Sequence, residues 1–101
     1  MRLEWSRDAL DDLDEIFDYI ASYSVERATE FVNKLRSEAR ELIDTPRLGT
    51  MIPEIGEDAF RELYTHEYNI MYEIKKDTIL IHEVYNSKRI YIRSYNRNQR
   101  K

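Results

Sequence analysis

The sequence predicts an α+β fold, in which an N-terminal helical hairpin packs on a twisted antiparallel sheet of about four strands. Residues 60–89 alternate apolar and polar side chains with a period of two, which is typical of strands with one buried face. Residues 7–44 repeat apolar side chains at spacings of three and four, as amphipathic helices do. Because a sheet of few strands needs a cover for its apolar face, the helices are expected to supply one.

The strands are expected in the second half of the chain. The polar residues 76–77 interrupt the alternation, so residues 68–75 and 78–85 are expected to pair as a hairpin. A third strand, about residues 60–65, is expected to turn back at residues 66–67. These three segments predict an antiparallel meander, rich in the β-branched and aromatic residues that favour strands.

The first helix is expected over residues 7–22, after a short alternating strand at residues 1–5 that joins the meander. Ser6 is a suitable N-cap, and Asp8 complements the helix dipole. The apolar stripe consists of Ala9, Leu10, Leu13, Ile16, Phe17 and Ile20. The opposite face is acidic and is expected to be a solvated surface. Most of the acidic residues of this helix are expected on that face; they are Asp11, Asp12, Asp14, Glu15 and Asp18.

The second helix is expected to begin after Ser24, which can cap it, and to end near Asp44. Pro46 disfavours helical geometry in the residue before it, which sets this end. The connection between the helices is short, so they are expected to be antiparallel neighbours. Residues 46–59 contain both prolines and both glycines and are expected to form a loop before the meander.

The size and composition predict one domain, residues 1–101, with a basic tail from about residue 94. The chain contains no cysteine, which excludes disulfides and thiolate metal sites. No apolar run approaches the roughly 20 residues of a membrane span, and the N-terminus lacks a signal-peptide pattern. A cytoplasmic protein without membrane contact is therefore expected.

The charge is distributed unevenly, although the chain as a whole carries a formal net charge of −4. Residues 1–60 are net acidic and residues 61–101 are net basic, with no acid from Lys88 onward. The basic end could meet nucleic acid or an acidic protein segment. It could equally serve only to keep a small protein soluble.

The sequence contains no familiar catalytic motif, neither a Gly-rich phosphate loop nor a nucleophile elbow, and no cofactor or metal is expected. A cluster of arginines and tyrosines does lie on or beside the predicted sheet. Its members are Arg61, Tyr64, Tyr68, Tyr72, Tyr85, Arg89, Tyr91, Arg93 and Tyr95. Guanidinium groups suit phosphate and rings stack on bases, so the cluster could bind single-stranded RNA. Alternatively, the tyrosines are half-buried strand formers and the arginines are solubilising.

Cleavage of RNA without metal would need a base for the 2′-hydroxyl, an acid for the leaving oxygen and cations for the phosphorane. Arg61 and Arg89 could supply the cations, and Tyr95 could relay a proton. No residue stands out as the base. His82 and Glu83 are neighbours in a predicted strand and are expected to face opposite sides of the sheet.

Several short motifs follow one another along residues 3–93. They are Ala9-Leu10-Asp11-Asp12-Leu13, Tyr19-Ile20, Pro46 to Gly49, Arg61-Glu62-Leu63, Tyr68 to Ile74, Ile79 to Val84 and Arg89. In order and spacing they resemble the RelE/ParE superfamily of bacterial toxins from type II toxin–antitoxin pairs. The ParE branch is the closer likeness, through the D-D-L helix and the R-E-L strand.

The resemblance implies the same compact α+β domain and a cognate antitoxin that wraps and neutralises the toxin. ParE-like members poison DNA gyrase, whereas RelE-like members cut messenger RNA on the ribosome. We therefore expect a toxin that inhibits gyrase by binding. The alternatives are a ribosome-dependent, metal-independent endoribonuclease and an inactive family member.

The residues expected to contact the target are Arg61, Arg89, Arg93 and Tyr95. If the protein is a ribonuclease, Arg61, Arg89 and Tyr95 are the expected catalytic residues. Arg89 and Tyr95 match by spacing the terminal Arg and Tyr of the nuclease branch, whereas Asn69 stands where that branch places a basic residue. The antitoxin segment is expected to lie against the helical hairpin or a sheet edge, as a helix or an added strand.

Overall fold

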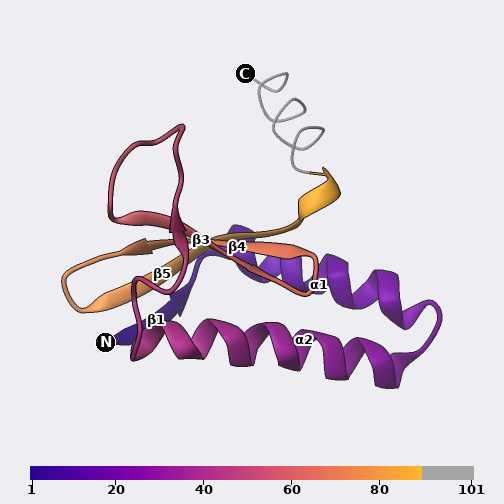
Figure 1. Cartoon of the computed structure of the whole chain (residues 1–101). Helices are drawn as coiled ribbons and strands as arrows, with labels where there is room; N and C mark the ends of the chain where they lie inside the picture. Colours follow the sequence, from indigo (N-terminus) through magenta and orange to yellow (C-terminus); the bar gives the residue numbers. More distant parts are fainter. Residues whose placement is uncertain (90–101) are drawn as a thin grey trace.

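The computed structural model describes residues 1–89, which form two helices on one side of a five-stranded sheet (Figure 1). The elements are β1 (Arg2–Trp5), α1 (Arg7–Ala21), α2 (Val25–Arg40), η1 (Glu41–Ile43), β2 (Thr50–Met51), β3 (Phe60–Thr65), β4 (Tyr68–Ile74), β5 (Thr78–Asn86) and η2 (Ser87–Arg89). The predicted helical hairpin and the meander of β3, β4 and β5 are confirmed. The predicted basic tail, from about residue 94, lies outside the described residues.

The sheet differs from the predicted one at its two edges. The strand order is β1-β5-β4-β3-β2, and β1 runs parallel to β5, so the sheet is mixed rather than wholly antiparallel. β2 forms inside the segment predicted as a loop and pairs antiparallel with β3. Alternation in sequence gives no strand direction, and two residues are too few to show a period, which explains both differences.

Both helices begin at the predicted caps. The Ser6 hydroxyl accepts a hydrogen bond from the Ala9 N–H at 3.0 Å, and the Ser24 hydroxyl accepts one from the Arg27 N–H at 3.2 Å. α2 passes into the 3₁₀ turn η1 before Pro46, close to the predicted end. Neither α1 nor α2, nor any other helix of the described part, has the length and apolar character to cross a membrane.

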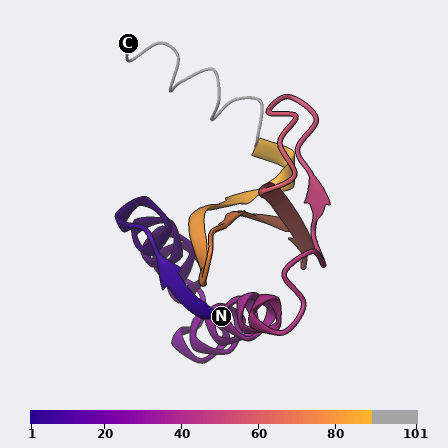
Figure 2. The same cartoon turned by 90° about the vertical axis from the view of Figure 1, so that its left-hand side faces the viewer.

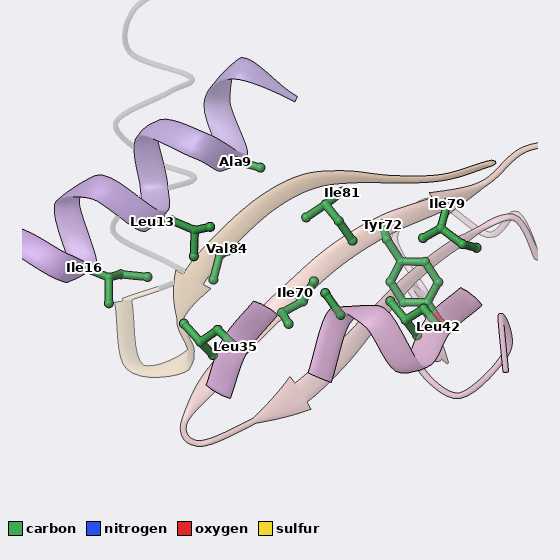
Figure 3. Close-up of a cluster of buried hydrophobic side chains, with 11 residues drawn as sticks. Ala9, Leu13, Ile16, Leu35, Leu42, Ile70, Tyr72, Ile79, Ile81 and Val84 are labelled. Carbon is green, nitrogen blue, oxygen red and sulfur yellow. The ribbon is translucent and has the colours of Figure 1, made fainter. Parts of the chain in front are cut away.

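The core lies between the helical hairpin and the sheet. Figure 2 shows α1 and α2 side by side on the same side of the curved sheet. Figure 3 shows side chains from both layers meeting there, with Leu13 of α1 beside Val84 of β5. The cluster consists of Ala9, Leu13, Ile16, Leu35, Ala39, Leu42, Ile70, Tyr72, Ile79, Ile81 and Val84. Removing this apolar surface from water is the main contribution to stability.

Asp12 departs from the prediction of a solvated acidic face, because its side chain is only 4% exposed. Its carboxylate accepts a hydrogen bond from the backbone N–H of Val84 at 2.9 Å. Pairing between β1 and β5 ends at Trp5, and α1 then continues along the same edge. The Ser6 hydroxyl donates to the His82 carbonyl at 2.9 Å. The side chains of Ser6 and Asp12 thus bond backbone groups of β5 that lie beyond the end of its pairing with β1.

A β-bulge interrupts β5 and overturns the expectation that His82 and Glu83 face opposite sides. Tyr72 of β4 pairs with Ile81, but the adjacent Met71 pairs with Glu83, so His82 is an extra residue. Met71 and its partner Glu83 lie on the face away from the helices. The His82 Nε2 atom lies 2.9 Å from Glu73 Oε1 on that same face. The bulge therefore brings both side chains to one side.

Candidate functional site

The face of the sheet turned away from α1 and α2, called the outer face below, is one candidate for contact with a target. The register of the strands assigns its side chains. On β3, β4 and β5 they are Phe60, Glu62, Tyr64, Asn69, Met71, Glu73, Leu80, His82, Glu83 and Tyr85. Glu62, Glu73 and Glu83 are acidic, and none of these side chains is a lysine or arginine. The edge strand β1 adds Arg2 and Glu4, which form an ion pair with each other. The strands of the described chain thus present an acidic outer face.

The arginine–tyrosine cluster predicted from the sequence is divided by the sheet. Tyr68 lies on the helix side, where its ring packs 5.5 Å from Phe31. Tyr72 is fully buried in the core. Tyr64 and Tyr85 lie on the outer face, and Tyr85 donates a hydrogen bond to Glu62. The described tyrosines therefore do not form one platform on which successive bases could stack.

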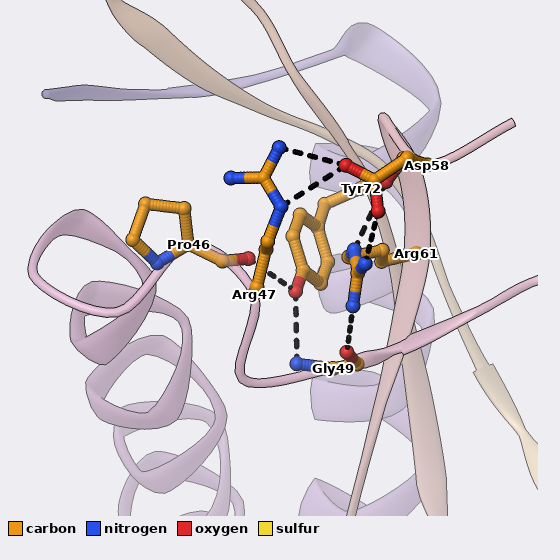
Figure 4. A network of polar contacts seen from close by, with 6 residues as sticks. All are labelled: Pro46, Arg47, Gly49, Asp58, Arg61 and Tyr72. Atoms are coloured by element: carbon orange, nitrogen blue, oxygen red, sulfur yellow. Dashed lines mark hydrogen bonds and ion pairs between the residues drawn. The ribbon is translucent and has the colours of Figure 1, made fainter.

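Tyr72 anchors the segment that connects α2 with β3. Its hydroxyl donates a hydrogen bond to the Pro46 carbonyl at 2.6 Å and accepts one from the Gly49 N–H at 2.9 Å (Figure 4). Burial raises the pKa of this phenol, so it keeps its proton and can donate. A Cβ atom at Gly49 would lie 2.7 Å from the Glu62 carbonyl oxygen and 2.8 Å from the Tyr72 hydroxyl, so only glycine fits.

Arg61 belongs to the same network, and its side chain is only 13% exposed. Its Nη1 donates to the Gly49 carbonyl at 2.8 Å and its Nε to the Asp58 carbonyl at 2.9 Å. Its Nη2 pairs with the Asp58 carboxylate, which also receives two hydrogen bonds from Arg47 at 2.7 and 3.0 Å (Figure 4). The hydrogen bonds from Arg47 and then Arg61 hold the pKa of Asp58 below its usual 3.8.

Of the four predicted site residues, the structure describes Arg61 and the backbone of Arg89. The guanidinium of Arg61 is directed at the connecting segment on the helix side. Arg89 is the last residue of η2, directly after β5. Arg93 and Tyr95 lie outside the described residues. The roles predicted for these four residues in target contact and catalysis remain predictions.

Sequence reasoning missed the structural use of Asp12, Asp58 and Tyr72. For Asp12 a signal was present, since it follows Ala9 by three positions and precedes Ile16 by four, which puts it on the buried stripe. Tyr72 gave no such signal, because its partner Pro46 lies 26 positions away in the chain. Asp58 joins Arg61, three positions away, to Arg47, 11 positions away, and no helical or strand spacing marks this arrangement. The described residues contain no group of three or more metal-ligating side chains.

The buried Tyr85 is expected to make the free energy of unfolding decrease as the pH rises in the alkaline range. Burial, followed by the hydrogen bond to Glu62 at 2.7 Å, raises the pKa of Tyr85 far above its usual 10.0. The folded state therefore holds this proton more tightly than the unfolded state. The resulting stabilisation is complete below pH 10 and is lost as the pH rises above it, by up to about 1.4 kcal/mol per pH unit.

We expect Tyr85→Phe to make the decline of stability above pH 10 shallower. Urea unfolding of both proteins at a series of pH values from 9 upward measures this. An unchanged slope in the variant would show that the Tyr85 proton is not held as described.

Comparison with known proteins agrees with this architecture. Residues 3–91 match the family model described as the ParE toxin of the type II toxin–antitoxin system parDE. A chain of the chromosomal ParDE system from P. aeruginosa is similar with a TM-score of 0.71 and 25% identity, covering 85% of this chain and 95% of that one. A chain of the RelB–RelE complex from Methanococcus jannaschii has the same fold, with a TM-score of 0.57 and 16% identity, over 89% and 96% of the two chains. No curated protein matches the sequence.

The fold and these matches define a toxin of a type II toxin–antitoxin system. The family model covers most of the chain, so the protein belongs to the ParE toxin family. Membership of this family implies a cognate antitoxin as its partner. The resemblance to the RelE/ParE superfamily, with the ParE branch closer, is thereby confirmed.

Proposed function

We propose that this toxin acts by binding DNA gyrase and trapping it on cut DNA, without bond chemistry of its own. The sequence resembles the ParE-like toxins, which poison gyrase, and the family match supports the same branch. On this proposal the protein works in the cytoplasm, and the cognate antitoxin neutralises it by direct binding. The proposal needs a shaped binding surface and no catalytic constellation.

The acidic outer face is the observation that most favours binding over RNA cleavage. A ribonuclease of this kind needs cations where the phosphate of the substrate lies. The strands instead place Glu62, Glu73 and Glu83 on the outer face, while Arg61 is bonded to Gly49 and Asp58 on the helix side. The alternative, ribosome-dependent cleavage of messenger RNA, was predicted to use Arg61, Arg89 and Tyr95, and with Arg61 bonded in this way it depends on Arg89 and Tyr95.

Supercoiling of relaxed plasmid by purified gyrase and ATP tests the proposal. We expect added toxin to stop supercoiling and excess cognate antitoxin to restore it. In a parallel reaction with translating ribosomes, we expect the messenger RNA to remain intact. Unimpeded supercoiling together with cut messenger RNA would replace the proposal with the ribonuclease alternative, and Arg89→Ala and Tyr95→Phe would then be the variants to examine.

A further inference from the structure

The turn that joins α1 and α2 exposes apolar side chains that the core does not use. Tyr19, Tyr23 and Val25 have exposures of 60%, 80% and 62%. We call these three residues the hairpin tip. Figure 1 shows this turn at the far right, beyond the end of the sheet. The hairpin tip is therefore open to a large partner without interference from the sheet.

The hairpin tip is held in a defined conformation. The rings of Tyr19 and Tyr23 meet edge to face, with centroids 6.1 Å apart and planes at 75°. The backbone N–H groups of Tyr23 and Ser24 both donate to the Ile20 carbonyl at 2.9 Å, and Ser22 donates from its hydroxyl to the Tyr19 carbonyl at 2.6 Å. A turn that is already ordered loses little conformational entropy on binding, and exposed tyrosines are typical anchors of protein interfaces.

Acidic side chains surround the hairpin tip. Between positions 14 and 30 the chain has five exposed acidic residues and one exposed basic residue. The acidic residues are Asp14, Glu15, Asp18, Glu26 and Glu30, and the basic residue is Arg27. Charge of one sign around an apolar centre attracts a partner of the opposite charge and repels an acidic one.

We propose that the hairpin tip binds a basic protein surface of DNA gyrase. This inference rests on the proposed function. An enzyme that handles DNA must expose lysine and arginine side chains to hold the phosphate backbone, so gyrase offers basic surfaces. Such side chains complement the acidic surround, and their cationic groups can lie over the Tyr19 and Tyr23 rings. The contacts predicted for Arg89, Arg93 and Tyr95 are separate from this one, because those residues belong to the basic C-terminal part of the chain.

The variant Tyr19→Ala/Tyr23→Ala tests the inference. We expect the concentration of toxin that halves gyrase supercoiling to rise more than about tenfold, as loss of two interface anchors does. The variant should melt as the wild type does, because both side chains are largely exposed. Leu48→Ala is the matched control, since Leu48 is 44% exposed in the segment after α2 and should leave inhibition unchanged.

The acidic surround is tested with Glu15→Gln/Asp18→Asn, which should weaken inhibition and reduce its dependence on salt. Asp44→Asn, at the other end of the second helical segment, is its control. All three residues are exposed and each substitution keeps the size of the side chain, so these variants should fold as the wild type does.

One result would overturn the inference while the proposed function stands, namely full inhibition of gyrase by the folded Tyr19→Ala/Tyr23→Ala variant. If that variant also escapes neutralisation by the antitoxin, the hairpin tip belongs to the antitoxin interface instead. If the wild-type protein does not inhibit gyrase, the proposed function itself fails.

Discussion

Tyr72→Ala is expected to lower the free energy of unfolding by about 3–5 kcal/mol, the usual result of truncating a large buried aromatic side chain. Tyr72 is the largest fully buried side chain of the described chain. Its ring packs in the core between the helices and the sheet, and its hydroxyl bonds Pro46 and Gly49. The substitution therefore opens a cavity and releases the segment before β2 at the same time. Denaturant unfolding measures the loss.

Tyr72→Phe separates these two contributions. It keeps the ring but leaves the Pro46 carbonyl and the Gly49 N–H without this partner, so we expect a loss of about 1–3 kcal/mol. If Tyr72→Phe were as stable as the wild type, the hydroxyl would not anchor the connecting segment. If Tyr72→Ala lost less than about 1 kcal/mol, the packing described for the core would be wrong.

Arg61→Ala is expected to lower the free energy of unfolding by about 1–3 kcal/mol, since it removes the donor to the Gly49 and Asp58 carbonyls. Arg47→Ala is the matched control, because it breaks an ion pair to the same Asp58 carboxylate from a side chain that is 63% exposed. Exposed ion pairs contribute little, so the control should change stability by less than about 1 kcal/mol.

Arg61→Ala also distinguishes a structural role of Arg61 from the predicted target contact. The geometry favours a structural role, in which Arg61→Ala reduces inhibition of gyrase only as far as it reduces the folded fraction. An Arg61→Ala protein that melts like the wild type and no longer inhibits gyrase would contradict this and would support direct contact with the target.

The parts of the fold that could be predicted depend on local patterns. The ends of both helices could be predicted to within a few residues, because Ser6 and Ser24 cap them and Pro46 disfavours helix beyond Asp44. The meander followed from period-two alternation, and the turn at residues 66–67 was placed correctly although both residues adopt positive φ. Apolar surface on both segments then required them to pack together.

The parts that could not be predicted depend on contacts between distant positions. The direction of β1 is set by its pairing with β5, more than 70 positions away. One extra residue, His82, places Glu83 on the outer face, whereas regular alternation along β5 would place it on the helix side. The candidate site was the hardest part to predict, because the presence of arginines and tyrosines in the sequence does not show which face of the sheet each one occupies. Arg61 and Tyr72 proved to be register partners on the helix side, bonded to the connecting segment.

The decisive measurement is the accumulation of cut plasmid when toxin is incubated with gyrase, ATP and supercoiled or relaxed DNA. Reactions are stopped with detergent and protease, and linear DNA is scored on the gel that scores supercoiling. We predict that linear DNA rises with toxin concentration while supercoiling falls, and that toxin produces no linear DNA when gyrase is omitted. Supercoiling at the normal rate with no linear DNA, in the presence of correctly folded toxin, would contradict a toxin that binds gyrase and traps it on cut DNA.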